Sequence, residues 1–263
     1  MKNSAGVVCV SVQKDLSLKN QLIARLAPPS RSALLEHSEL VDLNLHAELL
    51  VAGCTGHHTY FPIDSFVSLI LPVKGENDLE MVLVGSEGMF NTIMVLGNTT
   101  STLTSIVQGA GRALRIHRNA LRLRRAEDEG LRQVMLGYAS VIQRQTEQRA
   151  ACLRYHSVPQ RLARSLLMAR DRAHSNELFL THESLSMMIG ARRDTVSHAA
   201  SALQQAGVIS YTRGYVWLLD EAALESATCA CYLTDLESYS LLQSHAEAFA
   251  DQPAPARIRV SSE

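Results

Sequence analysis

The sequence predicts an α+β protein, with an antiparallel β sandwich or roll first, one long helix next and a helical unit with a β-hairpin last. Three observations predict this order. Short apolar runs alternate with turn residues between residues 47 and 116, which is typical of antiparallel strands. Apolar side chains then recur every three or four residues from about residue 118, which is the helical period. Near residue 190, two short amphipathic segments flank a glycine and precede a second strand pattern.

The segment before the long helix divides into a leader, short helices and strands. Residues 1–20 are expected to form a mobile leader, and the apolar spacing of residues 21–46 favours short helices broken by Pro28-Pro29. The turn-forming residues 74–78 are expected to connect two strands as a β-hairpin. The expected strands cover residues 47–51, 65–72, 79–84, 102–107 and 113–116.

A narrow seam of apolar and small residues marks the long helix between residues 130 and 152. The seam recurs at alternating steps of three and four residues, the spacing with which two helices pair. Because it turns polar at Gln145 and Gln148, a helix that pairs with a second copy of the chain fits better than a core helix, and packing within one chain remains the alternative. The predicted dimer seam consists of Leu131, Val134, Met135, Tyr138, Val141, Ile142, Gln145, Arg149 and Cys152.

A break follows at Ser157-Val158-Pro159. Proline is tolerated in the first turn of a helix but disrupts a helix interior, so we expect a hinge here. A new helix is expected from Pro159 to about Arg172. Its inner face carries Leu162, Leu166, Leu167 and Ala169.

The residues from 181 onward contain the clearest motif. Thr181 is a natural N-cap for a helix over residues 182–189, and Gly190 supplies a tight turn because glycine takes left-handed dihedrals without steric cost. A second helix is expected over residues 192–206, ending at Gly207. A hairpin over residues 208–219 follows, with its turn at Arg213-Gly214. Two short helices about a glycine turn, followed by a hairpin, make a winged helix-turn-helix.

The second helix of this motif carries polar side chains over its first two turns, as a helix that contacts base edges in the major groove requires. Arg193 can bridge guanine O6 and N7, Asp194 can accept from cytosine N4 or orient the arginine, and His198 can donate to a base or a phosphate. The alternative is a helical hairpin whose polar face is merely solvated. The residues placed for the DNA backbone are Thr181, Arg192, Thr195, Ser197 and Arg213.

Charge is segregated along the chain although the net charge is only −1. Residues 21–111 carry three basic and nine acidic side chains, whereas residues 112–154 carry ten arginines and four acids. Residues 155–217 carry seven arginines and four acids, and two arginines face eight acids after residue 217. At short range a polyanion interacts with the local charges of a protein rather than with its net charge. The basic residues in the middle of the chain therefore favour double-stranded DNA as a partner. The alternative is that they are ordinary solvated helix faces.

The helix-turn-helix resembles that of the Crp/Fnr family of bacterial transcription regulators in residues 180–185, 189–197 and 203–209. The resemblance is weaker but extends from about Leu22 to Leu224. It implies a cyclic-nucleotide-binding-like β-roll sensor domain over residues 21–125, a dimerisation helix over 126–157 and a winged helix-turn-helix over 158–224, followed by an acidic C-terminal extension over 225–263. It also implies a homodimer that binds a pseudo-palindromic site and acts with RNA polymerase. The family's base-reading positions fall on Arg193, Asp194 and His198, of which the last is usually arginine in nucleotide-responsive members.

The effector site departs from the family pattern. Nucleotide-binding members carry a Gly-Glu pair and then an arginine that neutralises the cyclic phosphate. In this chain Asn91 and Thr92 stand at the Gly-Glu pair, and no lysine or arginine lies between Lys74 and Arg112. Glu87 lies nearby, but a carboxylate without a cation repels a phosphate. We therefore expect no response to cAMP and leave the effector ligand unknown.

Other classes of function lack support in the sequence. No H-E-x-x-H, Walker A or G-x-S-x-G motif is present, so we do not expect the chain to be an enzyme. The alternative to a DNA-binding regulator is a sensor module that acts through protein partners. No apolar stretch approaches the ~20 residues that span a bilayer, so we expect a cytoplasmic protein without a membrane partner. The five scattered cysteines suit a reducing compartment. Cys229-Ala230-Cys231 is the one close pair, and we expect neither a metal site, an iron–sulfur cluster nor another cofactor.

Overall fold

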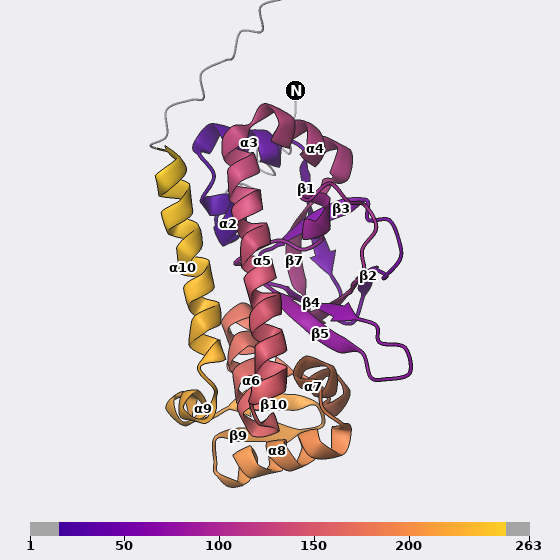
Figure 1. The fold of residues 1–263 in the computed structure, drawn as a ribbon, viewed down its shortest axis with the longest axis vertical. Helices are drawn as coiled ribbons and strands as arrows, with labels where there is room; N and C mark the ends of the chain where they lie inside the picture. Colours follow the sequence, from indigo (N-terminus) through magenta and orange to yellow (C-terminus); the bar gives the residue numbers. More distant parts are fainter. Residues whose placement is uncertain (1–15, 251–263) are drawn as a thin grey trace, which may run out of the picture.

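The computed structural model describes residues 16–250 and, among these, the side-chain surroundings of residues 16–240. The predicted α+β architecture is confirmed: a β-roll and a helix-turn-helix unit lie at opposite ends, and the long helix α5 (Glu129–Tyr155) runs along both (Figure 1). Residues 1–15 of the predicted leader and residues 251–263 of the predicted acidic extension lie outside the described residues.

Two antiparallel sheets form the roll, with strand orders β1-β7-β3 and β2-β6-β4-β5. Their inward side chains make two hydrophobic clusters, one joining Phe61 and Leu114 to the buried face of α5 and the other joining Val67, Phe90 and Val107. The strands are β1 (Ser38–Leu43), β2 (Glu48–Leu50), β3 (His58–Pro62), β4 (Phe66–Leu71), β5 (Leu79–Val84), β6 (Thr104–Gly109) and β7 (Gly111–His117).

The five predicted strands all overlap observed ones, but β1 and β3 were not predicted. β1 lies in the stretch for which only short helices were expected, and that expectation is wrong for residues 38–43. These residues form a strand because pairing with β7 sets Leu40 opposite Leu114. The prediction of short helices separated at Pro28-Pro29 is confirmed, because α2 (Gln21–Ala24) ends before the prolines and α3 (Pro28–Leu35) begins with them in its first turn.

The helical segment after β7 begins as α4 (Arg118–Glu127) and turns sharply at Asp128 into α5. The Asp128 side chain accepts a hydrogen bond from the backbone N–H of Leu131 at 2.9 Å, which caps the free amides at the start of α5. Helix α5 therefore starts three residues later than the predicted dimerisation helix. Its 27 residues make a rod of about 40 Å, long enough to contact both ends of the molecule.

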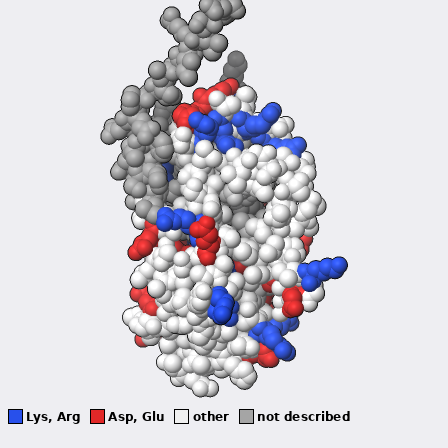
Figure 2. All heavy atoms as spheres, viewed as in Figure 1, with Lys and Arg blue, Asp and Glu red and all other residues white. Residues whose placement is uncertain are grey.

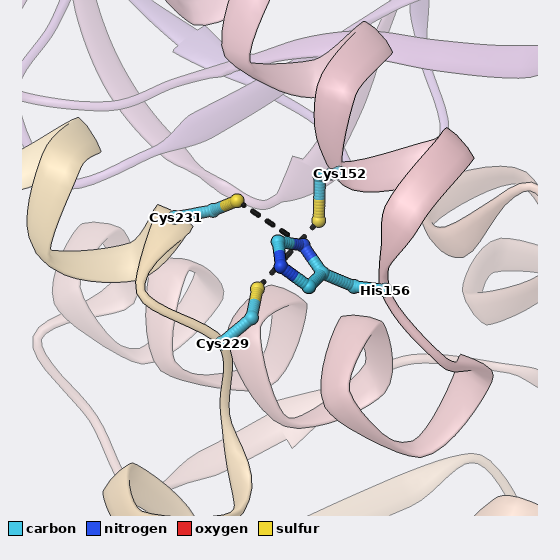
Figure 3. A group of neighbouring side chains, drawn as sticks. All are labelled: Cys152, His156, Cys229 and Cys231. Atoms are coloured by element: carbon cyan, nitrogen blue, oxygen red, sulfur yellow. Dashed lines mark hydrogen bonds between the residues drawn. The ribbon is translucent and has the colours of Figure 1, made fainter.

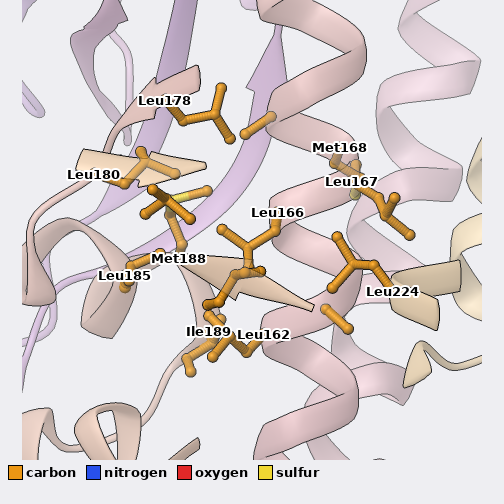
Figure 4. Close-up of a cluster of buried hydrophobic side chains, with 14 of the residues drawn as sticks. Leu162, Leu166, Leu167, Met168, Leu178, Leu180, Leu185, Met188, Ile189 and Leu224 are labelled. Carbon is orange, nitrogen blue, oxygen red and sulfur yellow. The ribbon is translucent and has the colours of Figure 1, made fainter. Parts of the chain in front are cut away.

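The C-terminal unit is built around α6 (Val158–Ala173), whose Leu162, Leu166 and Leu167 are fully buried (Figure 4). Ser157 and Gln160 form a capping box at its start, and Pro159 stands in its first turn, so the predicted hinge between α5 and α6 is confirmed as a break. A three-stranded sheet of order β8-β10-β9 completes the unit. The remaining elements are β8 (Glu177–Phe179), α7 (His182–Ile189), α8 (Arg193–Gln205), β9 (Ile209–Thr212) and β10 (Tyr215–Leu218).

The acidic extension folds back as two helices, α9 (Glu221–Ala227) and α10 (Cys231–Ala250). Helix α10 lies along α5, on a different side from the roll (Figure 1). The two helices are antiparallel, because Gln148 contacts Cys231 while Gln145 contacts Tyr239 further along α10. The C-terminal extension thus covers a side of the long helix.

Candidate nucleic-acid interface

The helix-turn-helix is built by three local features that the sequence predicted. The Thr181 hydroxyl accepts from the backbone N–H of Ser184 at 3.1 Å and caps α7. Gly190 takes the left-handed conformation, with φ +58°, and ends that helix. Beneath α8, Val196 is fully buried and Ala200 nearly so. The N-terminal half of α8 is therefore held on a packed core with its opposite side facing outward.

The three predicted base-reading residues all lie on this outward side. The side chains of Arg193 and Asp194 are 62% and 63% exposed, and His198 is exposed one turn further along. Arg193 forms an ion pair with Glu183 of α7 at 2.7 Å. The Thr195 backbone N–H donates to Asp194 at 2.8 Å and lowers the pKa of that carboxyl, which keeps it an acceptor at neutral pH.

The residues predicted to contact the DNA backbone surround these three. The side chain of Arg192 is 85% exposed, and Arg213 is exposed at the tip of the wing, in a left-handed turn conformation with φ +50°. Thr195 is exposed, whereas Thr181 is half-buried and its hydroxyl already caps α7. The Ser197 hydroxyl donates to the Arg193 carbonyl at 2.9 Å, so its proton is used within the helix.

The wing is fixed to the helices by aromatic contacts that the sequence analysis did not assign. The rings of His182 and Tyr211 stack at 4.6 Å between centroids, which joins α7 to β9. Phe179 and Tyr215 meet edge to face at 5.0 Å, which joins β8 to β10. The first contact fixes the wing to α7, and the second fixes β10 of the wing to β8.

Part of the basic middle segment is paired inside the molecule. Arg164 is buried with Asp235 of α10, and Arg172 is buried with Glu87 of the roll at 3.0 Å. Arg149, also buried, donates to the Met188 carbonyl. The charge segregation along the sequence therefore reflects internal pairing as well as surface charge, and only the exposed arginines remain for a nucleic acid.

The exposed charges are spread over separate places on the molecule. On the face in Figure 2, basic side chains gather at the α4 end, and smaller groups of basic and acidic side chains are scattered over the rest of the face. The surface at the helix-turn-helix is mixed rather than uniformly basic. Its cations are Arg192, Arg193 and Arg213, and its acids are Glu183 and Asp194.

The stretch predicted to replace the nucleotide cassette lies against the C-terminal unit. Glu87 accepts from the Gly85 backbone N–H at 3.0 Å, and Tyr239 of α10 donates to it at 3.4 Å. Burial lowers the pKa of Arg172, but the charge of Glu87 together with Tyr239 and Asp235 outweighs this effect, so that the pKa of Arg172 is raised. The cation that pairs with Glu87 is thus Arg172 of α6 in the same chain. The residues near Glu87 in the sequence did not indicate this partner.

A small cavity of about 110 Å³ lies in the roll beside Asn91. Among the described residues that line it, none is a lysine or an arginine. The cavity is lined in part by His58, whose pKa is lowered by burial and by the neighbouring charge of Arg115, so the imidazole is neutral at neutral pH. Tyr60 and Phe90 stack at 4.7 Å along its wall.

The predicted dimer seam is covered by the chain itself. Seven of its nine residues are buried, and Val134 and Ile142 are half-buried. Leu131, Met135 and Tyr138 pack into the core of the roll, and Gln145 donates to Tyr239 of α10. These contacts favour the alternative of a helix packed within one chain, since the polar end of the seam faces α10, and pairing through the seam stays a prediction.

The fold and the exposed recognition helix define a class: a DNA-binding protein with a β-roll and a winged helix-turn-helix. Residues 160–227 match the model of the Crp-like helix-turn-helix domain. The chain is 26% identical over 206 residues to the CRP-like cAMP-activated global transcriptional regulator of Mycobacterium tuberculosis, an alignment that covers 75% of this chain and 91% of that one.

Solved structures agree with this class in fold. The FixK2 structure from Bradyrhizobium japonicum superposes with a TM-score of 0.63 at 15% identity, covering 73% of this chain and 98% of that one. A CRP/FNR-family transcriptional regulator of Thermus thermophilus superposes with a TM-score of 0.61 at 21% identity, covering 72% and 97%. The chain therefore carries a Crp-like helix-turn-helix domain over residues 160–227 and is similar along most of its length to CRP-like transcription regulators. No helix among residues 16–250 has the length and hydropathy that crossing a membrane requires.

Proposed function

We propose that the chain binds a pseudo-palindromic double-stranded DNA site as a homodimer and acts there on RNA polymerase, without catalysing a reaction. The observation that carries the proposal is the exposed first half of α8, where Arg193, Asp194 and His198 project from a helix held by a capped α7 and a packed wing. These side chains supply the donors and acceptors that distinguish base pairs in the major groove.

Phosphate contacts come from the residues around this set. Arg192 and Arg213 stand exposed at the start of α8 and at the wing tip, which suits contacts with the backbone on either side of the recognition helix. Thr195 can add a hydroxyl. The Thr181 hydroxyl accepts from the Ser184 N–H, so its own proton can still be donated to a phosphate. The Ser197 proton is already donated to the Arg193 carbonyl, so we assign Ser197 the weaker role.

A homodimer follows from the reach of one recognition helix, because a single helix reads only a half-site. The seam predicted for pairing is covered, so the partner must meet the outward face of α5, where Ser140, Gln143 and Glu147 are exposed. We propose that two copies of α5 pair along this face and set the two recognition helices about 34 Å apart, one turn of DNA.

The proposed dimer face is tested with Ser140→Arg, because a large cation at a close helix–helix contact prevents pairing. The variant should sediment as a monomer at concentrations where the unmodified chain and the control Asn119→Arg, on the exposed surface of α4, sediment as dimers. A dimer that persists in Ser140→Arg would exclude this face.

We further propose that the β-roll does not bind cAMP or respond to it, although the Mycobacterium tuberculosis relative is named as cAMP-activated. The cavity of about 110 Å³ is smaller than the ~300–1,000 Å³ typical of small-molecule sites. It offers no arginine or lysine to the phosphate, and Asn91 at its edge is held in place by a 2.8 Å hydrogen bond to the His58 carbonyl. Calorimetric titration with cAMP should give no binding heat, and a saturable exothermic or endothermic isotherm would contradict this part of the proposal.

DNA binding itself is tested by a salt titration of affinity for double-stranded DNA. Each phosphate contact releases bound counterions, so the logarithm of the affinity should fall linearly and steeply with the logarithm of the salt concentration. A flat dependence, or no binding, would favour a sensor that acts through protein partners instead.

A further inference from the structure

Four potential metal ligands meet where α5 ends and the extension begins to fold back (Figure 3). Cys152 and His156 come from the last turn of α5 and the residue after it. Cys229 comes from the connection between α9 and α10, and Cys231 is the first residue of α10. The three cysteines are buried, with exposed fractions of 5% or less, and His156 is half-buried. No disulfide joins the cysteines of the described residues.

The spacing of the four ligand atoms fits a single tetrahedral ion. All four lie within 4.8 Å of one another. The sulfurs of Cys152 and Cys229 are 3.7 Å apart, and the Cys231 sulfur is 3.4 Å from Nδ1 of His156. Two thiolates bound to one zinc at about 2.3 Å, at tetrahedral angles, are separated by about 3.8 Å. The Cys152–Cys229 and Cys231–His156 pairs therefore stand near the edge lengths of a zinc site, and the remaining separations are within about 1 Å of them or shorter.

The sequence spacing explains how two pairs reach this geometry. Cys152 and His156 are four residues apart at the end of a helix, so they project from one face. Cys229 lies in the turn before α10 and Cys231 is the first residue of α10, with one residue between them, which lets both sulfurs face α5. The Gln148 side-chain amide donates to the Cys231 sulfur at 2.9 Å, the kind of outer contact that orients a thiolate ligand.

We propose that Cys152, His156, Cys229 and Cys231 form a closed Cys₃His site for one zinc ion. Three sulfurs and one imidazole nitrogen are a recurrent structural zinc set, and four protein ligands leave no open position for catalysis. An iron–sulfur cluster fits less well, because ligands on different irons are separated by bridging sulfide and lie further apart than the ligands of one ion. This site was not expected from the sequence, which offered only the Cys-x-Cys pair.

The site ties the C-terminal extension to the hinge of the regulator. Two ligands lie just before the α5–α6 break, and two lie at the start of α10. The binding energy of the ion therefore stabilises the docking of α10 on α5, in the way that structural zinc contributes to folding. The docked helix also holds the buried Arg164–Asp235 ion pair and the contact between Gln145 and Tyr239.

The first test measures metal in the full chain, purified without a histidine tag. Elemental analysis should find about one zinc per chain. After zinc removal under reducing conditions, Co²⁺ should bind with thiolate-to-cobalt charge transfer and intense visible bands of tetrahedral coordination. A chain that binds neither ion would overturn the proposal, as would iron with acid-labile sulfide or a Cys152–Cys229 disulfide in place of metal.

The second test uses variants. Cys229→Ser and Cys231→Ser should lose the stoichiometric metal and the cobalt bands, whereas Cys54→Ser, which changes an exposed cysteine of the roll, should keep both. Gln148→Ala keeps all four ligands and should weaken Co²⁺ binding by about 10–100-fold. Far-UV circular dichroism checks that each variant is folded. Full cobalt binding by folded Cys229→Ser would overturn the assignment.

Discussion

Arg193 is held in the free protein by an exposed ion pair with Glu183 at 2.7 Å. An exposed pair of this kind stabilises a protein by only about 0.2–1 kcal/mol. In the proposed complex, exchanging Glu183 for guanine would therefore cost little, and in the free protein the pair holds the guanidinium beside the start of α8. At the scale of single residues, the proposed base-reading side chain is thus already ordered in the free protein.

Arg193→Ala should weaken binding to the specific site by about 1–3 kcal/mol and relax the preference at one base pair of each half-site. The reason is the loss of paired hydrogen bonds to a base edge. Fluorescence anisotropy at fixed salt measures both affinities, with Arg122→Ala on the exposed surface of α4 as the control. An equal loss on random DNA would show that Arg193 contacts only phosphate.

Glu80 is a second residue with a direct consequence, because its buried carboxyl makes the stability of the protein depend on pH. Its carboxyl is buried in β5 beside Ser68, and burial raises its pKa despite the nearby charge of Arg149. The folded state therefore binds this proton more tightly than the unfolded state. Its contribution to stability is complete below the ordinary glutamate pKa and is lost as the pH rises through the folded pKa.

Glu80→Gln should remove the loss of stability that occurs as the pH rises, because the amide keeps a hydrogen bond to Ser68 and cannot ionise. Urea unfolding across pH should show the variant to be more stable than the unmodified chain above the raised pKa, with the difference shrinking toward acid. A variant that is less stable at every pH would show instead that Arg149 needs the ionised carboxylate.

At the scale of elements, the turn of the helix-turn-helix is a contact point as well as a turn. A Cβ on Gly190 would lie 2.9 Å from the side chains of both Leu153 of α5 and Leu79 of the β4–β5 hairpin. The motif is therefore packed against the long helix and the β-roll at the same glycine that makes it turn. The β4–β5 hairpin and α5 can both influence the position of α8 through this contact.

Gly190→Ala should destabilise the protein more than Gly207→Ala. Both glycines have positive φ, +58° and +72°, so both substitutions carry the cost of the left-handed conformation, about 1–2 kcal/mol. Only at Gly190 does the new methyl group meet other side chains, whereas nothing lies within 4 Å at Gly207. Denaturant unfolding measures the difference, and equal losses would refute the proposed contact.

The elements also show what could be predicted from the sequence. The helix-turn-helix was predicted because Thr181, Gly190 and Gly207 fix it through contacts a few residues apart. Strand β1 was missed because its conformation depends on β7, whose Leu114 pairs with Leu40 from 74 positions earlier. The metal ligands were missed for the same reason, since Cys152 and Cys229 are 77 positions apart.

At the scale of the whole molecule, one buried polar network joins all three parts. Arg172 of α6 contacts Glu87 of the roll at 3.0 Å, donates to the Leu83 carbonyl at 2.9 Å and reaches Tyr239 of α10 at 3.2 Å. The predicted dimer seam lies beneath the same region. The long helix therefore works first as an internal connector, and its polar outward face is what remains for a partner.

Arg172→Met should destabilise the protein by about 3–5 kcal/mol, because it leaves the Glu87 carboxylate buried and uncompensated. The double variant Arg172→Met with Glu87→Gln should recover part of this loss, since no buried charge then lacks a partner. Thermal and urea unfolding measure both. A double variant as unstable as the single one would mean that packing, rather than charge, sets the cost.

The most direct test of the whole account is selection of bound sequences from a random pool of double-stranded DNA by the purified full chain. A homodimer with two exposed copies of α8 should enrich a site with two-fold symmetry. The half-sites should be separated by one turn of DNA, about 34 Å. Arg193→Ala should lose one conserved base pair from each half of that site. Recovery of no common sequence, or of a site without symmetry, would contradict a homodimer that reads DNA with two copies of α8.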